Sequence, residues 1–267
     1  RVPGNERTSR WLGMDPVLWA REGLVDYIVP TPRWYSIDFG MPIDEWKRLL
    51  DGTGVMLGAA MEPRVNPYPR SGKSSQGSQT VNAELVRGAA ATYLNMGADR
   101  IYLMNFFDDR CDPLGRNLIT GEKLLHDVGS LANLAGKPRR HMITFQDVAA
   151  PGEAVAHALP LIPVIDYAGD PYFGELRIDT GPEPDGGSAT VMLAFEEENP
   201  DPPSDFEIYV NGCKASPLGR IDLEPPSPPT PAHGFDLPVS ALNSGHNVIE
   251  LMSDSPWAVH WAEIRLA

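Results

Sequence analysis

Residues 82–107 read NAELVRGAAATYLNMGADRIYLMNFF, and this stretch decides the predicted fold. Its first part has apolar side chains at the spacing of one helix face, opens with the capping residue Asn82 and closes at Gly97. Its last part, residues 101–107, is an apolar run of the kind found in parallel strands that are covered on both faces. The tight turn between the two parts predicts a helix that leads directly into a strand.

Two earlier apolar runs, at 24–30 (LVDYIVP) and 55–61 (VMLGAAM), resemble the run at 101–107. A helix pattern at 15–22 precedes the first run, and those at 44–50 and 82–96 separate the three runs. Strands and helices that alternate in this way predict right-handed βα units and a parallel sheet.

The connections at the two ends of these strands differ in length. Those that follow a strand are long, at 63–81 and 107–121, after which a further helix is predicted at 122–134. Those that follow a helix are tight, as at 97–99. This asymmetry is typical of a β/α barrel, whose functional loops follow the strands. An open doubly wound sheet is the alternative, although that fold favours a glycine-rich phosphate turn and the sequence has no GxGxxG or GxxxxGK[ST] motif.

The strand count is too small for a complete barrel. Three strands are evident and residues 1–3 read as the end of a fourth, whereas an eight-stranded barrel needs about 250 residues. We therefore expect residues 1–147 to form the C-terminal half of a (β/α)8 TIM-type barrel, with its last four βα units. This expectation implies a fragment of a longer protein, or a missing barrel half or another chain that covers the open sheet edge.

The sequence changes character after residue 147. Residues 148–165 read as a linker, and residues 166–267 predict an antiparallel β-sandwich as an accessory domain. Val-Asn-Gly at 210–212 is a hairpin signal, and the proline-rich segment 222–238 reads as a surface loop. The alternating runs that predict strands are 173–178, 189–195, 206–210, 247–252 and 259–266.

The net charge of −14 is distributed unevenly. Residues 1–150 hold 18 Lys and Arg against 17 Asp and Glu, whereas residues 151–267 hold 4 against 19. Because phosphate backbones require cations, this acidic second half argues against a nucleic-acid partner, and the first half has no basic stripe. No apolar run approaches the roughly 20 residues that cross a bilayer, so no membrane span is expected.

Glu62 is the leading catalytic candidate. It directly follows the run 55–61 and would lie at the rim of the predicted barrel, where reactive residues of this fold gather. A carboxyl group in a low-dielectric site either holds its proton and acts as an acid, or stays ionised as a base or nucleophile. The alternative is a structural ion pair with Arg64 or Arg1.

Other residues that follow the predicted strands are candidates for binding a substrate. Asp38 either positions a substrate hydroxyl or serves a turn, and the amide of Asn105 needs either a substrate hydroxyl or a loop carbonyl. Aromatic rings at these positions either suit the C–H faces of sugars or pack over the end of the barrel. The substrate-binding candidates are Trp34, Tyr35, Asp38, Arg64, Tyr68, Asn105, Phe106 and Asp108.

Neither a cofactor nor a metal is expected. The six histidines lack a ligand spacing such as HxxxH and have no cysteine partners. Asp108, Asp109 and Asp112 lack the remainder of a calcium-binding EF-hand loop and read as a solvated loop. The sequence has no GxSxG motif that would support a serine hydrolase.

The runs GMDPVLWAREGLVDYIVPT, VMLGAAMEP and AELVRGAAATYLNMGADRIYLMNFF carry a resemblance to a family. Together they resemble the C-terminal half of bacterial glycosyl-hydrolase-like barrel proteins, the family-10-like hypothetical glycosidases. Met104 stands where that family more usually has Phe. The resemblance covers residues 1–145 and implies a barrel with Glu62 after its seventh strand and Asn105 at its eighth. The segment from 206 to 266 is similar to sandwich domains appended to such enzymes.

The resemblance implies a glycoside hydrolase that acts on an oligo- or polysaccharide, in a full-length protein expected outside the cytoplasm. That reaction needs two carboxyl groups, about 5–5.5 Å apart in retaining enzymes or 6.5–9.5 Å apart in inverting ones, and the partner of Glu62 would lie on an earlier strand. The alternative is a non-catalytic carbohydrate-binding protein on the same scaffold. A third option is an adhesion module that uses the acidic sandwich.

Overall fold

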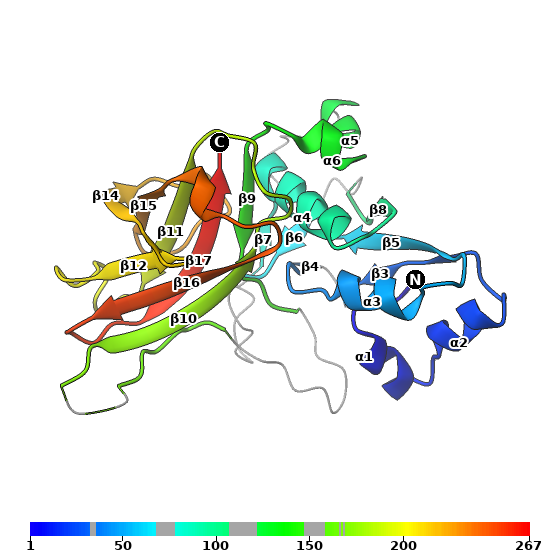
Figure 1. Ribbon diagram of the computed structural model, residues 1–267, viewed down its shortest axis with the longest axis horizontal. Coiled ribbons are helices and arrows are strands. Elements are labelled where there is room, and N and C mark those ends of the chain that lie inside the picture. The colour runs from blue at the N-terminus through cyan, green and yellow to red at the C-terminus, as the bar shows by residue number, and fades with distance from the viewer. Residues whose placement is uncertain (33–35, 68–77, 107–121, 147–157, 166, 168) are drawn as a thin grey trace.

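The structure is a computed structural model, and it describes residues 1–267 except 33–35, 68–77, 107–121, 147–157, 166 and 168. Short parallel strands and helices occupy one side of the molecule, and long antiparallel strands occupy the other (Figure 1). In the described part of the chain, no helix is both long and apolar enough to cross a membrane.

The helices of the N-terminal region lie where the sequence predicts them, except α1, which was not predicted. Asp15 and Asn82 accept hydrogen bonds from the backbone N–H groups of Leu18 and Leu85, which caps two of the helices. Gly129 divides the predicted helix at 122–134 into two short helices. The helices are α1 (Glu6–Trp11), α2 (Pro16–Arg21), α3 (Ile43–Leu49), α4 (Ala83–Asn95), α5 (Glu122–Asp127) and α6 (Leu131–Leu134).

The parallel strands form three small sheets. In the largest, β5 (Met56–Met61) lies between β2 (Tyr27–Ile28) and β8 (Arg100–Leu103), in parallel with both. The second pairs β1 (Val2–Pro3) with β3 (Pro30–Thr31). The third joins β4 (Ser36–Ile37) in parallel to β6 (Arg64–Val65), which pairs in antiparallel with β7 (Gln79–Thr80).

The prediction of half a TIM-type barrel is wrong. The described strands form five separate sheets, and none closes into a cylinder. Prolines contribute to this result, because Pro3 and Pro30 have no backbone N–H that could extend the hydrogen-bonded ladder between strands. The predicted strand at 24–30 is divided between β2 and β3. The strand that follows β8 in the chain, β9 (Arg139–Met142), does not continue the parallel sheet but pairs in antiparallel with β17 (Val259–Leu266).

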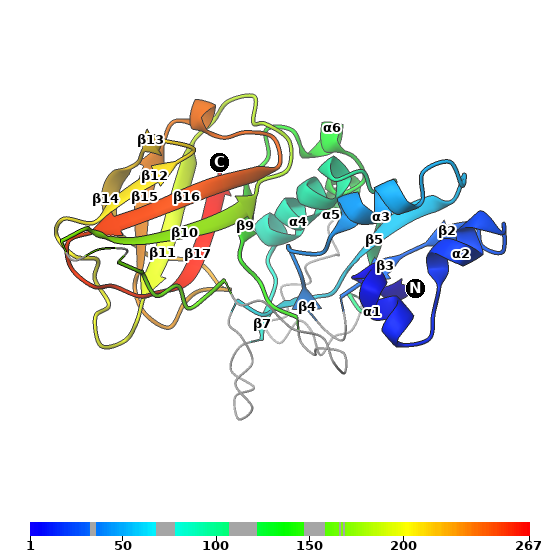
Figure 2. The same ribbon diagram turned by 60° about the horizontal axis from the view of Figure 1, so that its bottom comes forward.

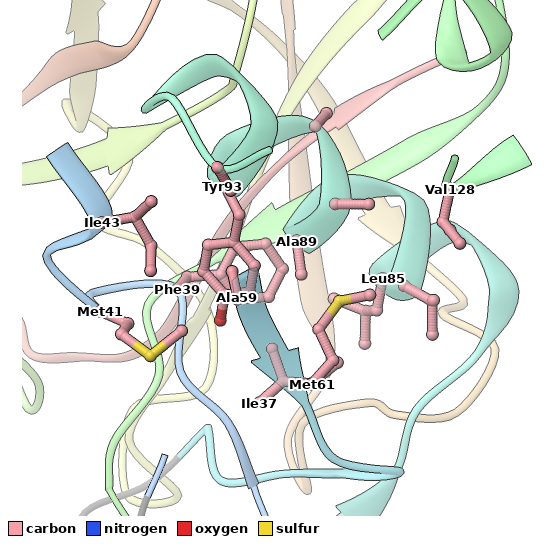
Figure 3. Close-up of a cluster of buried hydrophobic side chains, with 14 of the residues drawn as sticks. Ile37, Phe39, Met41, Ile43, Ala59, Met61, Leu85, Ala89, Tyr93 and Val128 are labelled. Carbon is pink, nitrogen blue, oxygen red and sulfur yellow. The ribbon is translucent and has the colours of Figure 1, made fainter. Parts of the chain in front are cut away.

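The core of the N-terminal region lies between α4 and β5. Figure 3 shows Leu85, Ala89 and Tyr93 of α4 facing Ala59 and Met61 of β5. The alternation along β5 explains this arrangement, because every second side chain of a strand points to the same face. The other face of α4 lies against β9, and an added Cβ at Gly88 would be only 1.9 Å from the carbonyl oxygen of Arg140. Helix α4 therefore fits between two sheets.

The C-terminal region consists of two stacked antiparallel sheets (Figure 2). One has the order β10 (Tyr172–Asp179), β16 (His246–Ser253), β12 (Glu207–Val210) and β13 (Cys213–Lys214). The other has the order β14 (Ser216–Ile221), β15 (Ala232–Leu237), β11 (Ala189–Phe195), β17 and β9. A short 3-10 helix, η3 (Val239–Ala241), precedes β16. Side chains from both sheets form a common apolar core.

The five runs predicted as strands in this region are all strands, and the hairpin signal is confirmed. Asn211 and Gly212 both have positive φ, 50° and 79°, as a two-residue hairpin turn between β12 and β13 requires. The prediction of a loop over the whole of 222–238 is wrong, because its last residues form β15, which pairs with β11 and β14. The strand residues, AHGFDL at 232–237, lie between Pro231 and Pro238 and include a glycine and a histidine, which weakens the strand signal in the sequence.

A buried ion pair fixes β9 to the C-terminal sheet. Arg140 donates through Nε and Nη2 to the two carboxylate oxygens of Glu263, at 2.9 and 3.0 Å. It also donates to the carbonyl oxygens of Glu224 and Pro226. Both charged side chains are almost completely buried. Strand β9, which precedes the predicted linker, therefore belongs to the same sheet as the end of the chain.

Candidate functional site

Glu62 lies directly after β5, the central strand of the largest parallel sheet. The last pair of this ladder joins Met61 to Leu103 on β8, so Glu62 follows at the carboxyl ends of adjacent parallel strands. Only 1% of Glu62 is exposed. A buried carboxyl group is costly unless charged or polar partners compensate for its lost hydration, so its contacts decide what it can do.

Among the residues that the structure describes, Arg1 and Asn105 contact the carboxylate of Glu62. The guanidinium Nη2 of Arg1 lies 3.5 Å from Oε1, and the amide Nδ2 of Asn105 donates to Oε2 at 3.0 Å. Arg1 also donates from Nε to Oγ1 of Thr31, at the end of β3. We call Arg1, Thr31, Glu62 and Asn105 the Glu62 cluster. Both the guanidinium and the amide donor favour an ionised carboxylate over a protonated one.

Asn105 has an unusual backbone conformation. Its φ of 57° is in the left-handed region, which asparagine tolerates better than most residues. Asn105 lies two residues after the end of β8, and its amide donates to Glu62 in this conformation. Strained backbone of this kind persists where surrounding contacts hold it, and it recurs at functional sites.

The partners of Glu62 are more accessible than Glu62 itself. The side chain of Arg1 is 36% exposed, and Asn105 is exposed. Rotation of either side chain into solvent would make room for a ligand beside the carboxylate oxygen that it contacts. The cluster can then offer a carboxylate acceptor, an amide and a guanidinium to the hydroxyl groups of a ligand.

Asp38 is not part of the Glu62 cluster, and its side chain stabilises the turn at residues 38–40. Its Oδ1 accepts hydrogen bonds from the N–H of Gly40 at 2.9 Å and from the hydroxyl of Thr144 at 3.4 Å. Its backbone carbonyl accepts from the buried hydroxyl of Tyr93 at 2.7 Å. Burial, together with the charge of Asp38, raises the pKa of Tyr93 well above its usual range, so this hydroxyl remains a hydrogen-bond donor.

A small pocket of about 230 Å³ opens beside Asp38. It lies between the start of α1, the 38–42 turn and Gln146, and Asn5, Thr8 and Glu45 also line it. Glu62 is not among the residues that line it. The structure therefore does not bring Asp38 and Glu62 together in this pocket.

The remaining predicted site residues fall into three groups. Arg64 donates to the hydroxyl and carbonyl oxygens of Ser78, at 2.7 and 3.0 Å, and Arg1 rather than Arg64 forms the ion pair with Glu62. Phe106 is 9% exposed and packs in the apolar core instead of facing a ligand. The other candidates lie outside the described residues and are Trp34, Tyr35, Tyr68 and Asp108.

The ion pair of Glu62 with Arg1 is one of the two that the sequence analysis named, whereas Thr31 was not considered. A signal for Thr31 exists, since it directly follows the apolar run 24–30 as Glu62 directly follows the run 55–61. Within the described ranges, no group of three or more His, Cys, Asp or Glu side chains is placed to hold a metal ion.

Comparison with known proteins assigns no family to this chain. No protein-family model matches the chain, and no curated protein matches it significantly. The resemblance to glycosyl-hydrolase-like proteins therefore stays a prediction based on the quoted sequence runs.

Proposed function

We propose that the Glu62 cluster binds the hydroxyl groups of a carbohydrate and that Glu62 serves in the hydrolysis of its glycosidic bond. The observation that supports this proposal is a buried carboxylate at the end of a central parallel strand, held by a guanidinium and by an amide on strained backbone. Carboxylate, guanidinium and amide groups together offer both acceptors and donors, which suits a polyhydroxylated ligand. The sequence runs that resemble glycosidases add to the case.

In this proposal, Glu62 acts as the ionised member of the pair of carboxyl groups that glycoside hydrolysis uses. An ionised carboxylate either activates a water molecule as a base or attacks the sugar as a nucleophile. The positive charge of Arg1 stabilises this ionised form, and it makes Glu62 poorly suited to donate a proton. Asn105 orients the oxygen that it contacts and leaves the other oxygen toward Arg1.

One observation favours the second candidate, a non-catalytic carbohydrate-binding protein. Glu62 is almost completely buried under the contacts that hold it, so the cluster binds hydroxyl groups through Arg1 and Asn105 more readily than it exposes Glu62 for reaction. In this case the carboxylate orients the two exposed side chains and does not touch the scissile bond.

Hydrolysis and binding assays on matched variants separate these two functions. Glu62→Gln keeps the size of the side chain and an oxygen that can accept from Asn105, and Glu45→Gln is the control because Glu45 lies on a helix surface in a weak pair with Arg48. Wild-type protein and both variants are incubated with a panel of 4-nitrophenyl glycosides. Their retention in gels that contain soluble polysaccharides is measured in parallel.

Each outcome has a defined meaning. If Glu62 reacts, we expect turnover to fall by about 10²- to 10⁴-fold in Glu62→Gln and to be unchanged in Glu45→Gln, since these are the usual contributions of such groups. Retention of wild type without turnover of any substrate supports the binding protein. Equal turnover by wild type and Glu62→Gln, or neither turnover nor retention, overturns the proposal.

A further inference from the structure

A second pocket is lined by residues that are distant in sequence from the Glu62 cluster, and it lies where α6 meets the end of β17. It has a volume of about 540 Å³. Four segments enclose it: α6 with the turn after it, the start of β9, the 182–187 loop and the last two residues of the chain. Figure 1 shows the C-terminus beside β9.

Arg139, the first residue of β9, lines this pocket and is only 5% exposed. Its Nη2 donates to the carbonyl oxygen of Pro182 at 3.1 Å, and its Nε has no hydrogen-bond partner among the residues that the structure describes. A guanidinium has five N–H donors, and a buried donor without an acceptor is costly. This side chain, which lines the pocket, therefore has a buried donor without an acceptor among the described residues.

Arg139 has no ion pair with any residue that the structure describes. Asp185 on the 182–187 loop acts on its charge from further away. Burial lowers the pKa of Arg139, and the negative charge of Asp185 opposes this shift. Arg139 keeps its positive charge, because the pKa of an arginine side chain lies far above neutral pH. Lys137, also in the pocket lining, is already bound to Asp127.

By contrast, its neighbour Arg140 is fully matched. The alternation along β9 places Arg140 on the opposite face, where Glu263 binds it through both carboxylate oxygens. Removal of one partner from a buried ion pair is strongly destabilising because it leaves a buried charge. Arg139 likewise has a buried charge without a carboxylate partner among the described residues. A carboxylate that enters the pocket would pair with Arg139 as Glu263 pairs with Arg140.

The shape of the pocket is set by the 182–187 loop. Gly187 has a φ of 93°, and an added Cβ there would lie 2.4 Å from the carbonyl oxygen of Ala267, so only glycine lets the loop approach the end of β17. Apolar side chains form much of the wall, from Leu131, Ala132, Ala135 and Leu266. Glu183 and Asp185 are exposed at the loop and oppose the entry of a multiply charged anion.

We propose that this pocket binds a small organic monocarboxylate, whose carboxylate pairs with Arg139 and whose apolar body packs against Leu131 and Leu266. The planar guanidinium matches a carboxylate in a two-pronged contact, and the apolar wall and acidic loop disfavour inorganic phosphate. The site is independent of the Glu62 cluster and of any activity there.

Calorimetric titration with benzoate tests this site, with benzamide as its neutral isostere. We expect wild-type protein to bind benzoate at least tenfold more tightly than benzamide or inorganic phosphate. Arg139→Gln should lose this preference. Arg177→Gln should keep it, because Arg177 is an exposed arginine that pairs with Glu175 on β10. Glu62→Gln should also keep it, which separates this site from the proposed function.

A second variant guards against loss of folding. Leu131→Trp fills the pocket without removing Arg139, and it should abolish benzoate binding while circular dichroism and the melting temperature remain close to wild type. Equal affinity for benzoate and benzamide, unchanged benzoate binding in folded Arg139→Gln, or no binding of benzoate by wild type would each overturn the proposal.

Discussion

The two regions of the molecule each contain a buried glutamate with an arginine partner, and the two pairs differ in how firmly they are held. Glu263 in the C-terminal region is bound through both oxygens by Arg140, and both side chains are nearly inaccessible. Glu62 in the N-terminal region has one contact to Arg1 at 3.5 Å, and that arginine is 36% exposed. A buried carboxylate alone does not indicate a site. The exposure of the partner distinguishes the two pairs, since the exposed Arg1 has space in which to rotate and the buried Arg140 does not.

The largest effect is expected from breaking the C-terminal pair. Glu263→Gln leaves the charge of Arg140 buried without a carboxylate, which should lower the free energy of unfolding by about 3–5 kcal/mol. Urea denaturation followed by tryptophan fluorescence measures this loss. The double variant Glu263→Gln, Arg140→Met is the control and should recover part of it; a single variant as stable as wild type would contradict the structural role of this pair.

A smaller effect is expected from the histidine at the junction of the two regions. His141 on β9 is completely buried, its Nδ1 lies 3.2 Å from the hydroxyl of Thr92 on α4, and burial and the charge of Arg139 hold its pKa well below the ordinary value. Below pH 6.5, His141 therefore binds a proton in the unfolded chain but not in the folded protein. Stability should fall with decreasing pH by about 1.4 kcal/mol per unit from this group.

Denaturation of wild type and His141→Gln between pH 7 and pH 5.5 measures this slope. The difference between the two proteins isolates His141 from carboxylates that titrate in the same range. His126→Gln, at an exposed helix position, is the control and should follow the wild-type curve. Parallel curves for wild type and His141→Gln would mean that the histidine is protonated in the folded protein.

The smallest effect on stability is expected at the Glu62 cluster. Glu62→Gln removes a charge from a pair whose arginine is part exposed, so the free energy of unfolding should fall by only about 1 kcal/mol, as for surface pairs. The same denaturation experiment measures it against Glu263→Gln. A loss as large as that of Glu263→Gln would assign both glutamates the same structural role.

The elements of both regions could be predicted from the sequence more accurately than the way they assemble. Helix α4 follows from the cap at Asn82, the apolar spacing and Gly97, and the hairpin at 211–212 follows from the turn residues. These signals are local. The barrel prediction failed because the pairing of strands is not local: nothing in the sequence of β9 indicates that its partner lies more than a hundred residues later, on β17.

The candidate site was predicted in part for the same reason. A carboxylate directly after an apolar strand was enough to select Glu62, and Asn105 was selected at the end of the next apolar run. The contact between them could be expected from adjacent parallel strands, whereas the left-handed backbone of Asn105 could not. For Phe106 the sequence left binding and packing open, because an aromatic residue near the end of a strand suits the core as well as a binding face, and the structure buries it.

The position of β9 has a consequence for how the protein unfolds. This strand is hydrogen-bonded to β17 on one side, while its backbone carbonyl at Arg140 lies so close to Gly88 that no methyl group fits between them. Separation of the two regions would expose the edge of the sheet that contains β17 and the face of helix α4 that packs against β9. Heating should therefore produce one cooperative transition, and a polypeptide cut just after this strand should yield neither part in its native form.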